Sequence, residues 1–385
     1  MAGLERSPPQ WRGREFALPL ESPLGTARGE IQSRTGRLVG IAADGHLRGV
    51  GEATPLPGWT ESAGECATAL DAVTAEDPRK GRLPSFATPA ARFAVGVAYR
   101  DRLARRRERS VAETLVGDPP HTVPVNATVG DGGVDETVAA AEAAVDAGFE
   151  TLKLKVGVRD PAADRERVRA VAEALAESAP DGHSTADPAT PGPTLRLDAN
   201  GAWDRETARE TLAALADRVA YVEQPVPADD LAGLAALRGV GAPVAADEAL
   251  ATHGPRAVVA ADAADVLVCK PAALGGLERT LSVARTAAAR GVDTVVTTTI
   301  DGVVARTAAT HLAAAVTAVT RSTGGRRGGW VSTPRAHGLA TGSLLARDLQ
   351  STDGEPLTDP VPVVDGRVAV PDTCGLAGPA FDTSL

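Results

Sequence analysis

The sequence has 385 residues, enough to bury a substantial core in one large or two ordinary domains. Its net charge of −10 and pI of about 5.2 argue against nucleic acid or an anionic membrane as a partner. No stretch approaches the roughly 18 uncharged apolar residues of a membrane helix, and residues 1–20 lack the apolar core of a signal peptide. We therefore expect a soluble protein of the cytoplasm.

The cysteines and histidines predict no metal site and no disulfide. Cys66, Cys269 and Cys374 are odd in number and widely spaced, which matches neither a disulfide framework nor a zinc pattern. The side chain of Cys269 is expected to point away from its neighbour Lys270 and into the core. The six histidines show no paired spacing, and His311 on an Ala-rich helix is expected to be packed.

Residues 1–118 predict an N-terminal α+β domain. The segment 36–57 reads as a β-hairpin because Asp44–Gly45 is a favoured two-residue turn between apolar runs. Helical periodicity follows at 61–75 and at 88–117.

Residues 119–349 alternate short apolar runs with Ala-rich helical patterns, which predicts a parallel sheet covered by helices. The expected strands are 123–129, 151–156, 194–199, 221–225, 243–248, 265–271 and 293–300, with a short eighth near 336–341. The expected helices are 134–148, 161–178, 204–218, 276–291 and 307–316. Units of roughly 25 residues, one of them lengthened by a polar loop at 178–194, predict a (β/α)8-type barrel. A doubly wound open sheet is the alternative, but no Gly-rich phosphate loop follows the first strand.

The end of the chain predicts a second hairpin. Residues 361–372 are apolar on both sides of Asp365–Gly366, another favoured turn. We expect about 350–385 to rejoin the N-terminal domain.

Lysine is rare in this sequence, and its positions are unusual. The chain has 40 lysine and arginine residues, of which only Lys80, Lys153, Lys155 and Lys270 are lysine. Three of these four lie in expected strands, where an arginine would not serve if an amine must lose its proton. Lys153 and Lys155 are two residues apart, so both side chains point to the same face of their strand. Each alone is more often a snorkelling residue than a catalytic one.

Acidic residues end the next three expected strands. Asp198, Glu223 and Asp247 lie at the carboxyl ends of neighbouring strands, which is where barrel enzymes gather their chemistry. Three carboxylates in one place repel each other unless a cation lies among them, and hard oxygen ligands suit Mg²⁺, with Mn²⁺ as an alternative. Lys270 ends the following strand, so it would face the other two lysines across the mouth of the barrel.

The series Lys-x-Lys, Asp-x-Asn, Glu-Gln-Pro, Asp-Glu and Lys-Pro on successive strands resembles the enolase superfamily, in its muconate-lactonizing-enzyme-like branch. Within that branch the sequence most resembles the o-succinylbenzoate synthases, through the segments 23–31, 49–62, 123–130, 195–203 and 337–349. The resemblance implies a modified TIM barrel, (β/α)7β, with residues 1–118 as an α+β capping domain and 119–349 as the catalytic barrel.

The resemblance also implies roles for particular residues. Lys155 would remove a proton next to a substrate carboxylate, while Lys153 and a nearby metal ion would favour its neutral form. Lys153 would also contact the substrate carboxylate. Lys270 would act as a cation on the other side of the substrate ring. Asp198, Glu223 and Asp247 would hold Mg²⁺, which would stabilise the enediolate. The substrate contacts would be Thr26, Arg28, Asn200, Glu248, Thr299 and Ile300, and the capping loops Thr26–Arg28 and Pro57–Trp59 would cover the succinyl arm.

The implied reaction is the dehydration of 2-succinyl-6-hydroxy-2,4-cyclohexadiene-1-carboxylate to o-succinylbenzoate, in menaquinone biosynthesis. The partner is a small-molecule carboxylate, and a homo-oligomer is compatible with the sequence.

The sequence departs from the family pattern after the seventh expected strand. Many relatives carry Ser-Ser and Glu where this chain has Thr297–Thr299 and Asp301. The Asp-x-Asp pair of dipeptide epimerases does not occur in 320–335.

Three other functions stay open. A racemase of N-acylamino acids or a cycloisomerase would use the same residues on another acid. A class I aldolase would use Lys270 as a Schiff-base amine, but would leave the three carboxylates unexplained. A binding or scaffold protein would have no need of paired lysines in a lysine-poor chain.

Overall fold

The N-terminal region forms an antiparallel three-stranded sheet in the order β1-β2-β3. The computed structural model describes residues 7–26, 29–177, 179, 184–187, 192–323, 326–327, 330–331 and 335–385. The strands are β1 Gln10–Thr26, β2 Gly29–Ala43 and β3 His46–Ala53. The predicted turn is confirmed, because Asp44 and Gly45 both have the positive φ of a tight hairpin. The hairpin is longer than predicted, and β1 was not expected at all.

Three helices follow this sheet: α1 Ala63–Thr74 and α2 Pro89–Arg106, which pack on it, and α3 Val111–Val116, which packs against α2 and a later helix, with a short 3-10 turn at Pro78–Lys80. The single helical segment predicted at 88–117 is therefore wrong. Glu108 has a left-handed backbone, and the Ser110 side chain accepts from Glu113 N and starts a new helix. A capping serine competes with helix continuation, which explains the break.

Two glycines let α2 lie directly on the backbone of β3. A Cβ atom at Gly51 would be 2.0 Å from the Ala94 carbonyl oxygen, and one at Gly49 would be 2.2 Å from that of Ala98. We expect Gly51→Ala to lower the free energy of unfolding by about 3 kcal/mol, because neither backbone segment can move away cheaply. Urea unfolding measures this. Gly96→Ala on the same helix, where no atom lies within 4 Å, should be neutral or stabilising.

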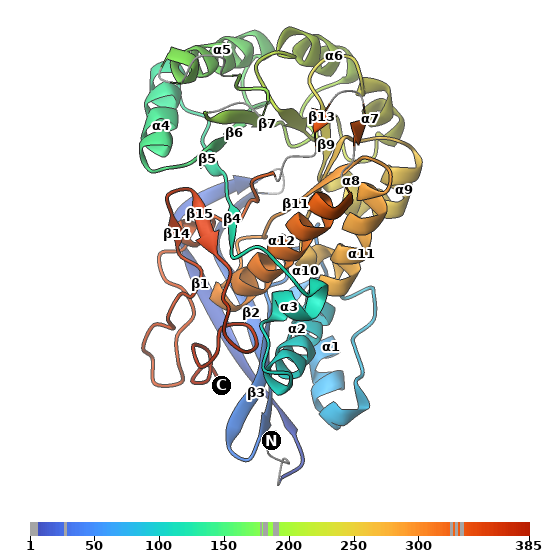
Figure 1. Cartoon of the computed structure of the whole chain (residues 1–385), viewed down its shortest axis with the longest axis vertical. Helices are drawn as coiled ribbons and strands as arrows, with labels where there is room; N and C mark the ends of the chain where they lie inside the picture. Colours follow the sequence, from blue (N-terminus) through green and yellow to red (C-terminus); the bar gives the residue numbers. More distant parts are fainter. Residues whose placement is uncertain are drawn as a thin grey trace.

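The second region is a seven-stranded parallel sheet in the order β11-β10-β9-β8-β7-β6-β5. Its strands are β5 Ala127–Val129, β6 Thr151–Lys155, β7 Thr194–Asp198, β8 Tyr221–Glu223, β9 Val244–Ala246, β10 Val266–Cys269 and β11 Asp293–Val296. Its helices are α4 Val134–Asp146, α5 Pro161–Glu177, α6 Arg205–Ala214, α7 Leu231–Leu237, α8 Glu248–His253, α9 Pro255–Ala260, α10 Pro271–Leu274, α11 Leu277–Ala288 and α12 Val303–Thr323. Figure 1 shows α4 to α6 outside the curved sheet and the long ribbon of β1 and β2 running away from it.

The inner and outer faces of the sheet carry different cores. Outward side chains such as Leu152, Leu197 and Cys269 pack against the helices in one large buried cluster, which confirms the predicted orientation of Cys269. The inner face holds a small cluster that includes Tyr221 and Val268. The interior is therefore filled, as in a TIM barrel, and the predicted barrel class is confirmed.

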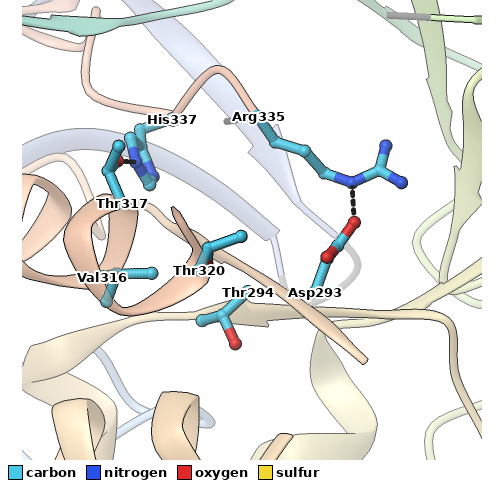
Figure 2. A pocket seen from close by; sticks show the side chains of 7 residues that line it. All are labelled: Asp293, Thr294, Val316, Thr317, Thr320, Arg335 and His337. Carbon is cyan, nitrogen blue, oxygen red and sulfur yellow. Dashed lines mark hydrogen bonds and ion pairs between the residues drawn. The ribbon is translucent and has the colours of Figure 1, made fainter. Parts of the chain in front are cut away.

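The predicted eighth strand is present only as two bridges. His337 forms a parallel bridge with Val125, between β4 and β5, and Gly338 forms one with Thr297, directly after β11. This short segment connects the two edges of the seven-stranded sheet. The His337 ring supports it, since Nδ1 accepts from Val296 N at 3.0 Å and Nε2 lies 3.1 Å from the Thr317 hydroxyl. Figure 2 shows this pair beside a cavity of about 10 Å³, room for about one water.

The end of the chain contacts both regions. Strands β14 Val363–Val364 and β15 Arg367–Ala369 form the predicted hairpin, which pairs with β4 Thr122–Pro124 at the entry to the barrel. Leu376 N donates to Asp101 on α2 at 2.8 Å, which ties the chain end to the N-terminal helices.

The exact limits of the two domains stay a prediction. The predicted loop at 178–194 lies largely outside the described residues, and β12 Arg326–Arg327 with β13 Trp330–Val331 forms a separate ladder.

Helix α12 runs through the centre of the molecule. Its segment Val303–Ser322 is apolar and long enough to cross a membrane by composition, but 89% of the tested window is buried inside the protein. Its residue His311 is fully buried, as predicted, where Nδ1 accepts from Ala112 N at 3.2 Å and Nε2 lies 2.6 Å from the Leu376 carbonyl oxygen. This histidine joins α12 to α3 and to the end of the chain.

Acid should destabilise the protein partly through His311. Burial lowers the pKa of His311 from 6.5 to about 4. The unfolded chain therefore binds the extra proton first, and stability is lost as the pH falls below 6.5. At pH 5 this histidine should cost about 2 kcal/mol. Urea unfolding of His311→Gln between pH 5 and 7 should show a correspondingly smaller loss, whereas exposed His46→Gln should follow the parent.

Candidate active site

The candidate site is a row of charged side chains at the carboxyl ends of five neighbouring strands. In the parallel register Lys155 pairs with Asp198, and Asp198 pairs with Glu223. Asp247 directly follows β9 and Lys270 directly follows β10. With Lys153 these six residues form what we call the lysine–carboxylate cluster. The predicted convergence of strands β6 to β10 is therefore seen in the structure.

Each lysine of the cluster contacts a buried carboxylate. Lys153 Nζ lies 2.9 Å from Asp198 Oδ2 and 3.3 Å from Glu223 Oε1. Lys155 Nζ contacts the same Asp198 oxygen at 2.7 Å, and Lys270 is paired with Asp247. The Lys155 side chain is 36% exposed, against 17% for Lys153. Lys155 is therefore the amine of this strand that a ligand entering the barrel mouth can reach.

Burial and mutual repulsion disfavour the charged forms of the three carboxyl groups in the cluster, and the lysines oppose this effect. Burial and the charge on Asp198 raise the pKa of Glu223 to about 7. Burial likewise raises the pKa of Asp247 to about 6, although Lys270 opposes this. For Asp198 burial works in the same direction, but Lys153 and Lys155 outweigh it and hold the pKa of that carboxyl well below its usual range. In turn the two acids outweigh burial and raise the pKa of Lys153.

The donor set fits a hard divalent cation. Within the described part of the chain, no three acidic, histidine or cysteine side chains form a ready-made metal site, because lysine ammonium groups lie against the carboxylates. However, Glu248 Oε2 is buried without any hydrogen-bond partner, next to Asp247. Three buried carboxylates and this free oxygen form an all-oxygen set of the kind that Mg²⁺ prefers. Asp198, Glu223 and Asp247 would hold the ion.

Asn200 and Glu248 lie beside the cluster, and their contact with a substrate stays a prediction. Asn200 Oδ1 accepts from Lys155 Nζ at 2.8 Å, and its Nδ2 donates to Glu248 Oε1 at 3.0 Å. Asn200 has a φ of 45°, a left-handed backbone that asparagine tolerates. The turn after β7 thus aims this amide at Lys155.

Gln224, for which the sequence analysis predicted no role, positions the loop after β9. Its φ of 40° is unusual for glutamine, and the side chain is fully buried. Oε1 accepts from the backbone N–H groups of Asp247 and Ala249, both at 3.1 Å, and Nε2 donates to Val226 O at 2.9 Å. Strain of this kind persists where surrounding contacts hold it, often beside a functional group. The left-handed backbone that reveals the role is not visible in the motif Glu-Gln-Pro.

Trp59 covers Lys270. The Lys270 Nζ atom lies 3.6 Å from the centroid of the indole ring, a cation–π contact between the N-terminal region and the barrel. This contact brings one of the expected covering loops, Pro57–Trp59, to the cluster. The two residues are more than 200 positions apart, so no local pattern predicts the contact.

The remaining predicted contacts are less directly placed. Thr299 follows β11 at the same end of the barrel, but its hydroxyl donates to Asp301 at 2.6 Å, and Ile300 has a φ of 60°. Thr26 ends β1, and Arg28 lies outside the described residues. Contact of these four residues with a substrate stays a prediction.

Comparison with known proteins places the chain in a family. A family model described as enolase C-terminal domain-like matches residues 136–378, which include the whole cluster. The chain belongs to the enolase superfamily. Solved structures agree: muconate lactonizing enzyme from Pseudomonas fluorescens, complexed with muconolactone, has a TM-score of 0.75 over 96% of each chain at 24% identity. A dipeptide epimerase from Methylococcus capsulatus, complexed with Mg and a dipeptide, has the same TM-score at 26% identity, covering 96% of this chain and 99% of that one.

Relatives within the superfamily differ in the reaction they are named for. Muconate cycloisomerase 1 of Rhodococcus opacus is 29% identical over 93% of this chain and 92% of its own. The o-succinylbenzoate synthase of Mycobacterium leprae is 35% identical over 67% of this chain and 66% of its own, and that of Thermobifida fusca is 37% identical over 59% and 62%. Family membership therefore leaves the individual reaction open.

Proposed function

We propose that the protein is a metal-dependent o-succinylbenzoate synthase acting in the cytoplasm on 2-succinyl-6-hydroxy-2,4-cyclohexadiene-1-carboxylate. The observation that carries the proposal is the placement of Lys155 and Lys270 on opposite sides of three buried carboxylates. The similarity to three synthases, at 32 to 37% identity, supports the choice within the superfamily.

Lys155 is the base in this proposal. Its side chain is the most exposed of the three cluster lysines, and Asn200 and Asp198 fix the position of Nζ. The neutral amine takes the proton next to the substrate carboxylate, and the ring hydroxyl leaves with a proton as water. The proton that Lys155 takes is the one that the leaving hydroxyl needs, so the amine can return it. The product ring is aromatic, which drives the elimination.

Lys270 and the metal ligands stabilise charge rather than move protons. Asp198, Glu223 and Asp247 would hold a divalent ion, which would supply positive charge to stabilise the negative charge that develops on the substrate. Lys270 is held by Asp247 and stays a fixed cation on the far side of the site. The Gln224 side chain accepts a hydrogen bond from the backbone N–H of Asp247 and so keeps Asp247 in place. The Asp247 carboxylate is therefore positioned before substrate arrives.

Muconate cycloisomerization is the second candidate. One specific observation favours it: the cycloisomerase of Rhodococcus opacus aligns over 93% of this chain, more than any synthase named above. Both reactions need an amine beside a carboxylate-stabilised enolate, so the cluster alone does not separate them.

Turnover of the diene substrate tests the proposal. Purified protein is mixed with 2-succinyl-6-hydroxy-2,4-cyclohexadiene-1-carboxylate, with Mg²⁺ or with EDTA, and the diene absorbance is followed. We expect fast loss with Mg²⁺ and none with EDTA. No loss of diene, with muconate or an N-acylamino acid converted instead, would overturn the synthase assignment. Turnover that survives EDTA, with borohydride trapping of Lys270, would favour an aldolase.

A further inference from the structure

A cavity of about 470 Å³ lies between the N-terminal region and the barrel. Its walls include Trp59, Phe86 in front of α2, Leu250 on α8 and Arg279 on α11. Among the described residues that line it there is no member of the lysine–carboxylate cluster. Its volume is that of an ordinary small-molecule site. The cavity is thus a separate space beside the candidate active site.

One wall of the cavity is aromatic and apolar, although the lining as a whole exposes more polar than apolar surface. Trp59 and Phe86 present aromatic rings, and Phe86 is 62% exposed although it is a large hydrophobic side chain. Leu250, Leu274 and Pro89 supply further apolar surface. An aromatic ring lying against this wall would gain ring–ring contacts in addition to the burial of apolar area.

Arg279, which is exposed, is the only cationic side chain among the described lining residues, and Arg92 lies outside the lining on the same Phe86 ring. The Arg279 guanidinium lies 4.6 Å from the Phe86 ring centroid and that of Arg92 lies 4.0 Å from it. No ion pair involves Arg279 in the part of the chain that the structure describes, and its neighbour Glu278 is paired with Arg100. Burial and then the charge of Arg279 lower the pKa of Arg92, so the two cations repel. A bound anion would relieve this repulsion.

The acidic side chains in the lining do not supply that anion. The two carboxylate oxygens of Glu61 accept from Ala90 N and Ala91 N, at 3.0 and 2.9 Å, and so cap α2. Glu65 accepts from Ser62 N at 2.9 Å in the cap of α1. Both carboxylates therefore hold positions at helix ends, and Arg279 is the lining cation that a bound carboxylate would contact.

We propose that this cavity is a second binding site, for a small planar carboxylate, and that Trp59 links its occupancy to Lys270. The indole of Trp59 lines the cavity and also covers Lys270 Nζ at 3.6 Å. A ligand in the cavity fixes the indole and thereby the access of substrate to Lys270. The proposed binding of a ligand rests on the cavity alone, whereas the proposed link to Lys270 rests on the proposed function.

Fluorine NMR titration of the full chain with 4-fluorobenzoate tests whether the cavity binds a ligand. A ligand of this size should bind with a Kd of about 1 mM. Arg279→Gln and Phe86→Ala should each weaken binding at least about five-fold, and uncharged 4-fluorobenzamide should bind the parent weakly. Arg256→Gln, at an exposed arginine outside the cavity lining, is the matched control and should bind like the parent.

The cluster itself can attract carboxylates, so Lys155→Ala decides where the probe binds. Binding retained in Lys155→Ala and lost in Arg279→Gln supports the cavity; the reverse pattern places the probe in the cluster and overturns the proposal. Saturating 4-fluorobenzoate should also shift the tryptophan emission of the parent but not of Trp59→Phe. No shift in the parent overturns the link to Lys270. A protein that binds the probe in the cavity but does not convert the diene loses the proposed function and the link that rests on it, and keeps the second binding site.

Discussion

Replacing Lys155 by alanine should lower kcat for the diene substrate by at least about 10³-fold, because the substitution removes the only base that the proposal gives to the reaction. Binding of substrate should change much less, since Lys153, Lys270 and the carboxylates remain. Steady-state kinetics with Mg²⁺ measures both quantities. Lys80, which is 63% exposed and paired with Glu76 on the surface, supplies the control: Lys80→Ala should behave like the parent.

Lys155→Arg separates proton transfer from charge. Arginine keeps a cation near Asp198 but cannot release its proton near neutral pH. If Lys155 is the base, Lys155→Arg should be as inactive as Lys155→Ala. Substantial activity in the arginine variant would mean that Lys155 acts only as a cation, and another group would have to take the proton.

The cluster could be predicted because it follows from repetition. Each strand-helix unit puts its charged residue at the same end, and the parallel register of β6, β7 and β8 aligns Lys155, Asp198 and Glu223 without any contribution from distant parts of the chain. Local periodicity also gave the strands and most barrel helices. These features depend on residues close in sequence, which is why sequence reasoning found them.

The features that were missed depend on contacts between distant residues. Strand β1 contains Arg, Glu and Pro, and becomes a strand because it pairs with β2 over most of its length. The cover of Trp59 over Lys270 joins the two regions of the chain. The role of Gln224 appears only once its backbone is seen to be left-handed. Propensity and spacing do not encode such tertiary constraints.

A buried glutamate in the N-terminal sheet fixes the start of α12. Glu52 on β3 is fully buried and accepts from Gly302 N at 2.6 Å, from Ala305 N at 2.9 Å and from the Thr54 hydroxyl at 2.6 Å. Gly302 directly follows the loop with Thr299 and Asp301. The carboxylate thus satisfies two backbone donors at a helix N-terminus that lies next to the barrel mouth.

Glu52→Ala should lower the free energy of unfolding by about 3–5 kcal/mol, because it leaves two buried N–H groups unpaired and opens a cavity. Glu52→Gln keeps the size and one acceptor oxygen, so it should cost about 1–2 kcal/mol near pH 5. Urea unfolding measures both variants. Glu15→Gln, at an exposed position on β1, should stay within about 0.5 kcal/mol of the parent. A Glu52→Ala variant as stable as the parent would remove Glu52 as the support of α12.

The pH dependence of the Glu52→Gln variant separates the effect of ionising the carboxyl group from the effect of the size and shape of the side chain. Burial, followed by the charge of Asp301, raises the pKa of Glu52 from 4.5 to about 7. Between pH 4.5 and about 7 the folded state holds a proton that the unfolded chain has lost. The stability that protonated Glu52 contributes is therefore complete below pH 4.5 and is lost as the pH rises through about 7. The parent should lose about 3 kcal/mol from this source by pH 8, whereas the glutamine cannot ionise. The stability gap between the two proteins should therefore narrow or reverse between pH 5 and pH 8, and a constant gap would mean that Glu52 is ionised throughout.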